Sequence, residues 1–197
     1  MTKVAAVSRH PSFVPDVRID MTPSRAIFLT GFMGAGKTSV GAELARRRGC
    51  AFHDLDAAVV ERAGKPVAQI FAAGGEAEFR RLESEALRHV LARVGASGAV
   101  VALGGGTLAT AENVRALRDA DGILVALAAP VVLLFERTRL ARGTRPLAED
   151  EAGFRRLYET RQPLYRAPNI DVSVDSGSGD VAAVAERVEQ AIAELKR

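Results

Sequence analysis

The chain has 197 residues, 48% of them apolar and 26% charged, and a net charge of +3. This length suits one domain with a full core, and the apolar runs, such as residues 123–129, are too short to cross a bilayer. The lack of tryptophan, and of a compact basic run with interleaved aromatic residues, argues against a nucleic-acid-binding protein.

Residues 1–24 differ from the rest of the chain, because they carry three prolines, scattered charge and no sustained hydrophobic period. We expect them to form a flexible leader before a single domain that spans residues 25–197. No apolar segment follows the first lysine, as a secretory signal would require. The only cysteine, Cys50, cannot form an internal disulfide, which suits a reducing, cytoplasmic environment.

Apolar runs and helical stripes alternate from residue 25 onward. Strands are expected at 26–30, 51–53, 99–103, 123–127 and, with the alternation of an edge strand, 170–174. Helices are expected at 38–48, 56–63, 67–72, 76–94, 112–118, 131–137, 153–161 and 181–195. The pattern predicts an α/β fold with three αβα layers and a central, mostly parallel, five-stranded sheet. The polar, basic segment 138–150 interrupts it and is expected to form a mobile lid.

The segment GFMGAGKT at residues 31–38 fits the pattern G-x-x-x-x-G-K-[ST] between a strand and a helix. Glycines let the backbone approach phosphate oxygens closely, and the following helix directs its positive end at them. Lys37 is expected to reach the β- and γ-phosphates, and the Thr38 hydroxyl to ligate Mg²⁺. The predicted ATP-binding residues of this loop are Gly34, Ala35, Gly36, Lys37, Thr38 and Ser39. The alternative is a glycine-rich turn with a surface lysine.

Two carboxylates, Asp54 and Asp56, follow the second strand, where open α/β sheets bind ligands. One could hold the water shell of Mg²⁺, and the other could orient a hydroxyl for attack or accept its proton. The alternative is a helix N-cap followed by an acidic first turn.

Arg80 and Glu83 are neighbours on the predicted helix 76–94. Either they form a surface ion pair of about 0–1 kcal/mol, or Glu83 orients Arg80 to bind a substrate carboxylate through two hydrogen bonds. The three glycines at 104–106 end the third strand and indicate either close approach by a substrate or a flexible turn. Spacing alone leaves both pairs of alternatives open.

The motifs GFMGAGKTSVG, FHDLD, GEAEFRRLE, LGGGT, TRPL and RQPLY follow one another from about residue 27 to the C-terminal end. In this order they resemble the shikimate kinases, in the nucleoside-monophosphate-kinase-like branch of P-loop proteins. The resemblance implies transfer of the γ-phosphate of ATP to the 3-hydroxyl of shikimate, with Mg²⁺ as cofactor, on the way to aromatic amino acids. The partners it implies are two small molecules, ATP and shikimate, and we expect a monomer.

The resemblance also implies roles for individual residues. The catalytic residues would be Lys37, Asp56 and Arg145. The shikimate site would comprise Asp56, Arg80, Gly104, Gly105, Gly106 and Arg161, with Phe71 and Phe79 as an apolar wall. Arg137 would lie against adenine and Arg145 on the phosphates, and the metal would be held by Thr38 and, through water, by Asp54.

The lid segment is about one residue longer than the family pattern, so Arg139 or Arg142 could take the place of Arg137. Two rival functions stay open at this point. One is a kinase of the same fold that acts on gluconate or a nucleoside monophosphate. The other is a non-catalytic regulator that binds nucleotide without turnover. The two-arginine carboxylate clamp argues against a neutral or phosphate-bearing acceptor, and the complete set of catalytic residue types argues against the regulator.

Overall fold

The structure, a computed structural model, describes residues 25–94, 98–140, 150–166 and 170–195. Five strands form one sheet: β1 (Ile27–Thr30), β2 (Ala51–Asp54), β3 (Ala99–Ala102), β4 (Ile123–Ala128) and β5 (Val172–Asp175). The strand order is β2-β3-β1-β4-β5, and every pairing is parallel. The predicted fold class is confirmed, and β5 lies at the edge of the sheet as its alternating sequence predicts.

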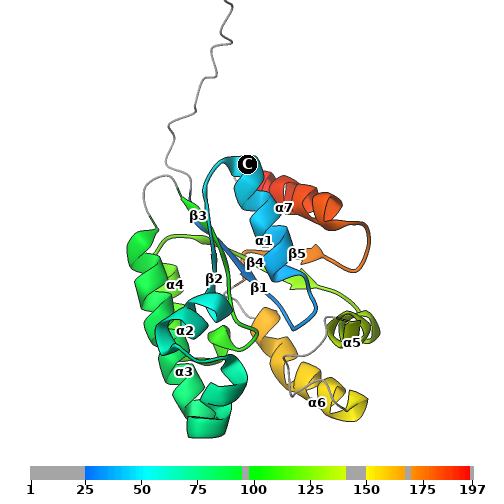
Figure 1. Cartoon of the computed structure of the whole chain (residues 1–197). Coiled ribbons are helices and arrows are strands. Elements are labelled where there is room, and N and C mark those ends of the chain that lie inside the picture. Colours follow the sequence, from blue (N-terminus) through cyan, green and yellow to red (C-terminus); the bar gives the residue numbers. More distant parts are fainter. Residues whose placement is uncertain (1–24, 95–97, 141–149, 167–169, 196–197) are drawn as a thin grey trace, which may run out of the picture.

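Helices cover both faces of this sheet (Figure 1). They are α1 (Lys37–Arg48), α2 (Leu55–Ala63), α3 (Val67–Arg93), α4 (Ala111–Asp119), α5 (Val131–Leu140), α6 (Glu151–Arg161) and α7 (Val181–Leu195). Two short 3₁₀ helices, η1 (Thr107–Ala109) and η3 (Gln162–Tyr165), follow β3 and α6. Among the helices within the described ranges, none combines the length and the apolar character needed to cross a membrane.

Alternate residues of the central strand β1 point into two different cores. Leu29 packs in a cluster with Leu44 of α1 and Val188 of α7. Phe28 packs on the opposite face, in a cluster with Leu87 of α3. Because side chains alternate along a strand, a short run that is apolar at every position requires a helix layer on each side. This requirement gives the three layers, with α1 and α7 side by side on one face (Figure 1).

The segment from residue 67 to 93 contains two helical parts that meet at Gly75, between the helices that the sequence predicts at 67–72 and 76–94. Gly75 has a φ of 67° and a ψ of −164°, which are not helical. Only glycine adopts that backbone conformation readily. Across the kink the rings of Phe71 and Phe79 stack with their centroids 4.8 Å apart. The kink therefore folds the start of α3 back over the part that carries Arg80.

Candidate functional site

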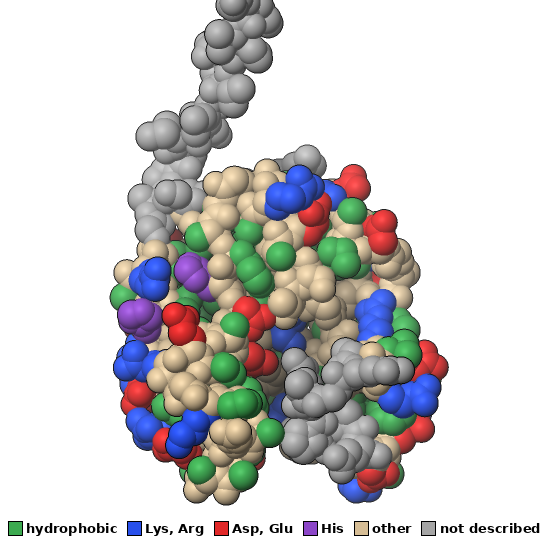
Figure 2. Space-filling view, viewed as in Figure 1, with side chains coloured by type: hydrophobic (Ala, Val, Ile, Leu, Met, Phe, Trp, Pro, Cys, Tyr) green, Lys and Arg blue, Asp and Glu red, His purple; other side chains and the backbone are tan. Residues whose placement is uncertain are grey.

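A cavity of about 320 Å³ opens at the carboxyl ends of β1, β2 and β3. Its lining residues are Gly34, Gly36, Lys37, Thr38, Ser39, Asp54, Asp56, Ala102, Leu103, Arg137 and Thr138. In the space-filling view, acidic and basic side chains meet in the hollow near the centre of this face (Figure 2). The glycine-rich loop, the two acids and Arg137 are thus brought together, as the strand-end argument predicts.

The loop between β1 and α1 has the backbone of a phosphate-binding turn. Gly31, Gly34 and Gly36 have φ values of 137°, 82° and 91°. A Cβ atom on Gly34 would lie 2.6 Å from the carbonyl oxygen of Leu134, so no larger residue fits there. At the start of α1 no side chain caps the amides and the first turn holds no acidic residue. The positive end of the helix therefore faces the cavity without competition from a carboxylate.

The Lys37 ammonium lies over this loop, where its Nζ donates to the carbonyl oxygens of Gly31 at 2.8 Å and Phe32 at 3.2 Å. Ala35 is buried, and its amide donates to the Phe32 carbonyl oxygen at 3.2 Å. The sequence placed Ala35 among the ATP-binding residues, and here it shapes the turn without lining the cavity. The loop thus holds the Lys37 ammonium beside the cavity, where its positive charge can attract the phosphates of a nucleotide.

Asp54 caps a helix and also contacts the predicted metal-site hydroxyl of Thr38. Its Oδ1 accepts from the Ala57 amide at 3.1 Å and caps α2. Its Oδ2 accepts from the Thr38 hydroxyl at 2.7 Å, so the two predicted metal-site groups are in contact. Asp56 also lines the cavity. A hydroxyl–carboxylate pair beside a phosphate loop fits Mg²⁺, which prefers oxygen ligands and keeps several waters.

No dedicated metal cage exists in the described parts of the chain, where no cluster of three or more His, Cys, Asp and Glu side chains could hold an ion. Mg²⁺ in kinases is bound by one or two protein groups together with substrate phosphates. The Thr38–Asp54 pair supplies protein groups of that kind. The donor set therefore suits a metal that arrives with a nucleotide.

Arg80 and Glu83 do not form a surface ion pair. Arg80 Nη1 donates to Glu83 Oε2 at 2.7 Å, Glu83 is fully buried, and the Arg80 side chain is only 19% exposed. Burial alone would lower the pKa of Arg80, but the carboxylates of Glu83 and Glu76 outweigh it, so the pKa is raised and the guanidinium stays charged. The guanidinium carbon also lies 5.3 Å from the ring centre of Phe79. Arg80 is thus held from two sides.

The glycine turn after β3 adjoins all three side chains that the resemblance places around the substrate. A Cβ atom on Gly104 would overlap Glu83 Oε1, and it would lie 3.1 Å from Asp56 Oδ1. One on Gly106 would lie 2.7 Å from Arg80 Cζ, and one on Gly105 would lie 3.7 Å from Arg161 Nη1. A side chain at the first or third glycine would therefore displace Glu83 or Arg80.

Two residues of this region escaped the sequence reasoning. Tyr165 donates from its hydroxyl to the Gly105 carbonyl oxygen at 2.5 Å, and burial raises its pKa against the opposing effect of Arg161 and Arg80. Thr107 is buried, and its hydroxyl donates to Glu83 Oε1 at 2.8 Å. Both residues stand inside quoted motifs, RQPLY and LGGGT, yet nothing in their spacing indicates partners 60 and 24 residues away.

Of the predicted lid arginines, Arg137 lines the cavity, and its guanidinium donates to the Ser176 carbonyl oxygen at 2.8 Å. Arg139 is exposed and is not among the lining residues. Arg142 and Arg145 lie outside the described residues, as do residues 1–24 and most of the predicted lid. The geometry therefore favours Arg137 over Arg139 as the residue next to the nucleotide.

Comparisons with known proteins agree with this geometry. The family model described as shikimate kinase matches residues 33–193. The shikimate kinase of Halorhodospira halophila is 42% identical over 174 residues, which cover 87% of this chain and 94% of that protein. The shikimate kinase of one Thermus thermophilus strain is 39% identical over 176 residues, covering 88% of this chain and 89% of that protein.

Solved structures with a similar fold include a shikimate kinase and a gluconokinase. The shikimate kinase from Acinetobacter baumannii in complex with shikimate has a TM-score of 0.81 and 33% identity, covering 89% of this chain and 97% of that chain. A gluconokinase from Sinorhizobium meliloti has a TM-score of 0.58 and 20% identity, covering 88% of this chain and 94% of that chain. The gluconokinase shares the fold, and the match to the shikimate-bound enzyme is higher on both measures.

Proposed function

The chain belongs to the shikimate kinase family, and we propose that its site transfers the γ-phosphoryl group of ATP to the 3-hydroxyl of shikimate, giving ADP and shikimate 3-phosphate. One observation carries this proposal. Asp56, Arg80 and Arg161 each adjoin one of the three consecutive glycines 104–106, and Asp56 also lines the cavity beside the phosphate loop. An acid for the hydroxyl and two guanidinium groups for the carboxylate are the groups that a hydroxylated carboxylic acid requires.

Two arginines from different helices suit a planar carboxylate, because each guanidinium offers paired donors. Arg80 comes from α3 and Arg161 from the end of α6, so together they fix the substrate from two directions. Phe71 and Phe79 supply an apolar wall beside Arg80. The solved relative described as a complex with shikimate supports the same substrate for this chain.

The chemistry we propose is direct, in-line transfer without a phosphoenzyme, which asks mainly for positioning and charge neutralisation. Asp56 orients the attacking hydroxyl and accepts its proton. Lys37 stabilises the charge that spreads over the γ-phosphoryl oxygens, and we assign the same role to Arg145 from its sequence motif. Bound Mg²⁺ would neutralise phosphate oxygens, with Thr38 and, through water, Asp54 holding it.

We further propose that residues 25–197 form one catalytic domain, that the segment 138–150 acts as its lid, and that the enzyme works as a cytoplasmic monomer. The family model matches residues 33–193, which supports the single domain. The cytoplasmic location rests on the single cysteine and stays a prediction.

An ADP-release assay with shikimate, gluconate and a nucleoside monophosphate tests the function, and we expect turnover with shikimate. Lys37→Met should abolish turnover while leaving the circular-dichroism spectrum unchanged. Arg80→Ala should raise the KM for shikimate at least about tenfold, as loss of a charged hydrogen bond predicts, with little change for ATP. Arg88→Ala is the matched control, because Arg88 lies exposed on the same helix and pairs with Glu112.

Three results would contradict the proposal. Turnover of gluconate or of the nucleoside monophosphate in preference to shikimate would reassign the substrate. Tight ATP binding without turnover of any acid would indicate a regulator. An unchanged shikimate KM in Arg80→Ala would remove the carboxylate clamp.

A further inference from the structure

A chain of buried polar groups runs from α4 to the substrate arginine. The Asn113 side-chain amide donates to the Thr107 carbonyl oxygen at 3.2 Å, and the Thr107 hydroxyl donates to Glu83 Oε1 at 2.8 Å. Glu83 Oε2 accepts from Arg80 Nη1 at 2.7 Å. Thr107 and Glu83 are fully buried, and Asn113 is 2% exposed. The two links through Thr107 are therefore shielded from water, where a hydrogen bond is stronger and a missing partner costs more.

The two oxygens of Glu83 have different partners, and this division fixes the plane of the carboxylate. Oε1 is held by Thr107 and Oε2 by Arg80. A guanidinium can bind both oxygens of a carboxylate at once. The Thr107 hydroxyl competes for Oε1 and so favours the arrangement in which Glu83 holds Arg80 through Nη1. The Nη2 atom, which donates to Glu76 Oε1 at 3.1 Å, then stays beside Gly106 of the glycine turn.

We propose that Thr107 is a positioning residue for substrate recognition. It orients Glu83, which in turn holds the Arg80 guanidinium in the orientation that binds the substrate carboxylate. This inference rests on the proposed function, since it concerns recognition of the same acid. It adds a specificity element that acts through Glu83 and touches no substrate. Thr107 therefore affects the discrimination between a carboxylate and a neutral group at that position.

The test compares Thr107→Ser and Thr107→Ala, which differ by a single hydroxyl. The serine variant should keep the shikimate KM within about twofold of the wild type. The alanine variant should raise it about tenfold, equivalent to about 1.4 kcal/mol, with kcat and the ATP KM nearly unchanged. The preference for shikimate over its methyl ester, measured as a ratio of kcat/KM, should fall in the alanine variant only, because the ester lacks the charge that Arg80 recognises.

Thr107→Val tests the same hydroxyl with the side-chain volume kept, and Thr110→Val is its matched control. Thr110 precedes α4, and its side chain makes no capping hydrogen bond. If the valine variant does not fold, the comparison of Thr107→Ser with Thr107→Ala alone tests the role of the hydroxyl. Equal shikimate KM values for the serine and alanine variants would overturn the inference, as would a parallel rise of the shikimate and ATP KM values. Wild-type protein that fails to phosphorylate shikimate would instead overturn the proposed function, so the two failures are distinguishable.

Discussion

Replacement of Gly106 by alanine should impair shikimate binding by displacing a side chain, without straining the backbone. Gly106 has φ −127° and ψ 6°, which a non-glycine residue can adopt. An added Cβ atom, however, would lie 2.7 Å from Arg80 Cζ and 2.8 Å from Nη1, whereas ordinary contacts begin at 3.4 Å. The guanidinium would have to retreat from the turn, because it is the movable end of a flexible side chain.

The size of the effect follows from the contacts that Arg80 would lose. Its hydrogen bond to Glu83 is 2.7 Å long, so a retreat to normal contact distance from the new methyl group lengthens or redirects it. A hydrogen bond to a charged group contributes about 1.5–3 kcal/mol. At 1.4 kcal/mol for each factor of ten, we expect a rise of about ten- to hundredfold in the shikimate KM. The ATP KM should change little, because Gly106 is not a lining residue of the nucleotide cavity.

A double-mutant cycle in the ADP-release assay checks the mechanism. Gly106→Ala and Arg80→Ala are measured singly and together, with kcat and both KM values for each protein. If the methyl group acts by pushing the guanidinium aside, it should have no further effect once that guanidinium is removed. Additive penalties in the double variant would refute this reasoning, since the alanine would then act on the substrate or on the turn itself.

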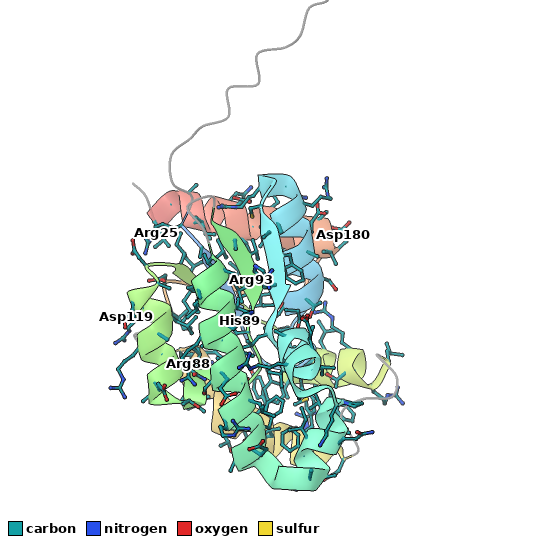
Figure 3. The ribbon with its side chains drawn as sticks, turned by 60° about the vertical axis from the view of Figure 1, so that its left-hand side comes forward. Arg25, Arg88, His89, Arg93, Asp119 and Asp180 are labelled. Carbon is teal, nitrogen blue, oxygen red and sulfur yellow. The ribbon has the colours of Figure 1, made fainter. Side chains whose placement is uncertain are left out.

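Two further predictions concern pH. Burial raises the pKa of Tyr165, so this tyrosine ionises at lower pH in the unfolded chain, and the free energy of unfolding should fall as the pH rises above about 10. Denaturant unfolding measured from pH 9 to 11 should show a shallower fall in that free energy for Tyr165→Phe than for the wild type. Equal slopes for the two proteins would contradict this prediction. Burial, helped by Arg93, lowers the pKa of His53, so stability is lost as the pH falls below about 6.5. A nuclear magnetic resonance titration, with the His53 signal assigned by its loss in His53→Asn, should show the midpoint of the His53 titration below 6.5. Figure 3 shows Arg93 and His89 on α3 beside β2.

Much of the fold could be predicted from the sequence, because its strands are buried on both faces. A run such as 26–29, apolar at every position, has no polar face and fits a strand between two helix layers. The separation of the helices at 67–72 and 76–94 was predicted, and the backbone between them is not helical at Gly75. The stacking of Phe71 on Phe79 across this kink was not predicted, because it depends on how sharply the chain bends there.

The candidate site could be predicted only in part. Lys37, Thr38 and Asp54 carry their chemistry in local motifs, and the structure brings them together at one edge of the sheet. Thr107 and Tyr165 act through partners that are distant in sequence, and a hydroxyl group next to a glycine run suggests no particular partner. Tertiary packing alone gives these two residues their positions.

The glycine turn explains why the acid and the two arginines have a fixed geometry. Its backbone is closed by a hydrogen bond from the Thr107 amide to the Gly104 carbonyl oxygen, at 3.2 Å. Each glycine then adjoins a different part of the site: Gly104 the Asp56 side, Gly105 the Arg161 side and Gly106 the Arg80 side. Because the carboxylate and the reacting hydroxyl belong to one rigid substrate ring, the protein groups that bind them must be held at fixed positions relative to one another. A side chain at Gly104 or Gly106 would shift Glu83 or Arg80 relative to the other groups, which is a stronger reason for glycine at these two positions than flexibility.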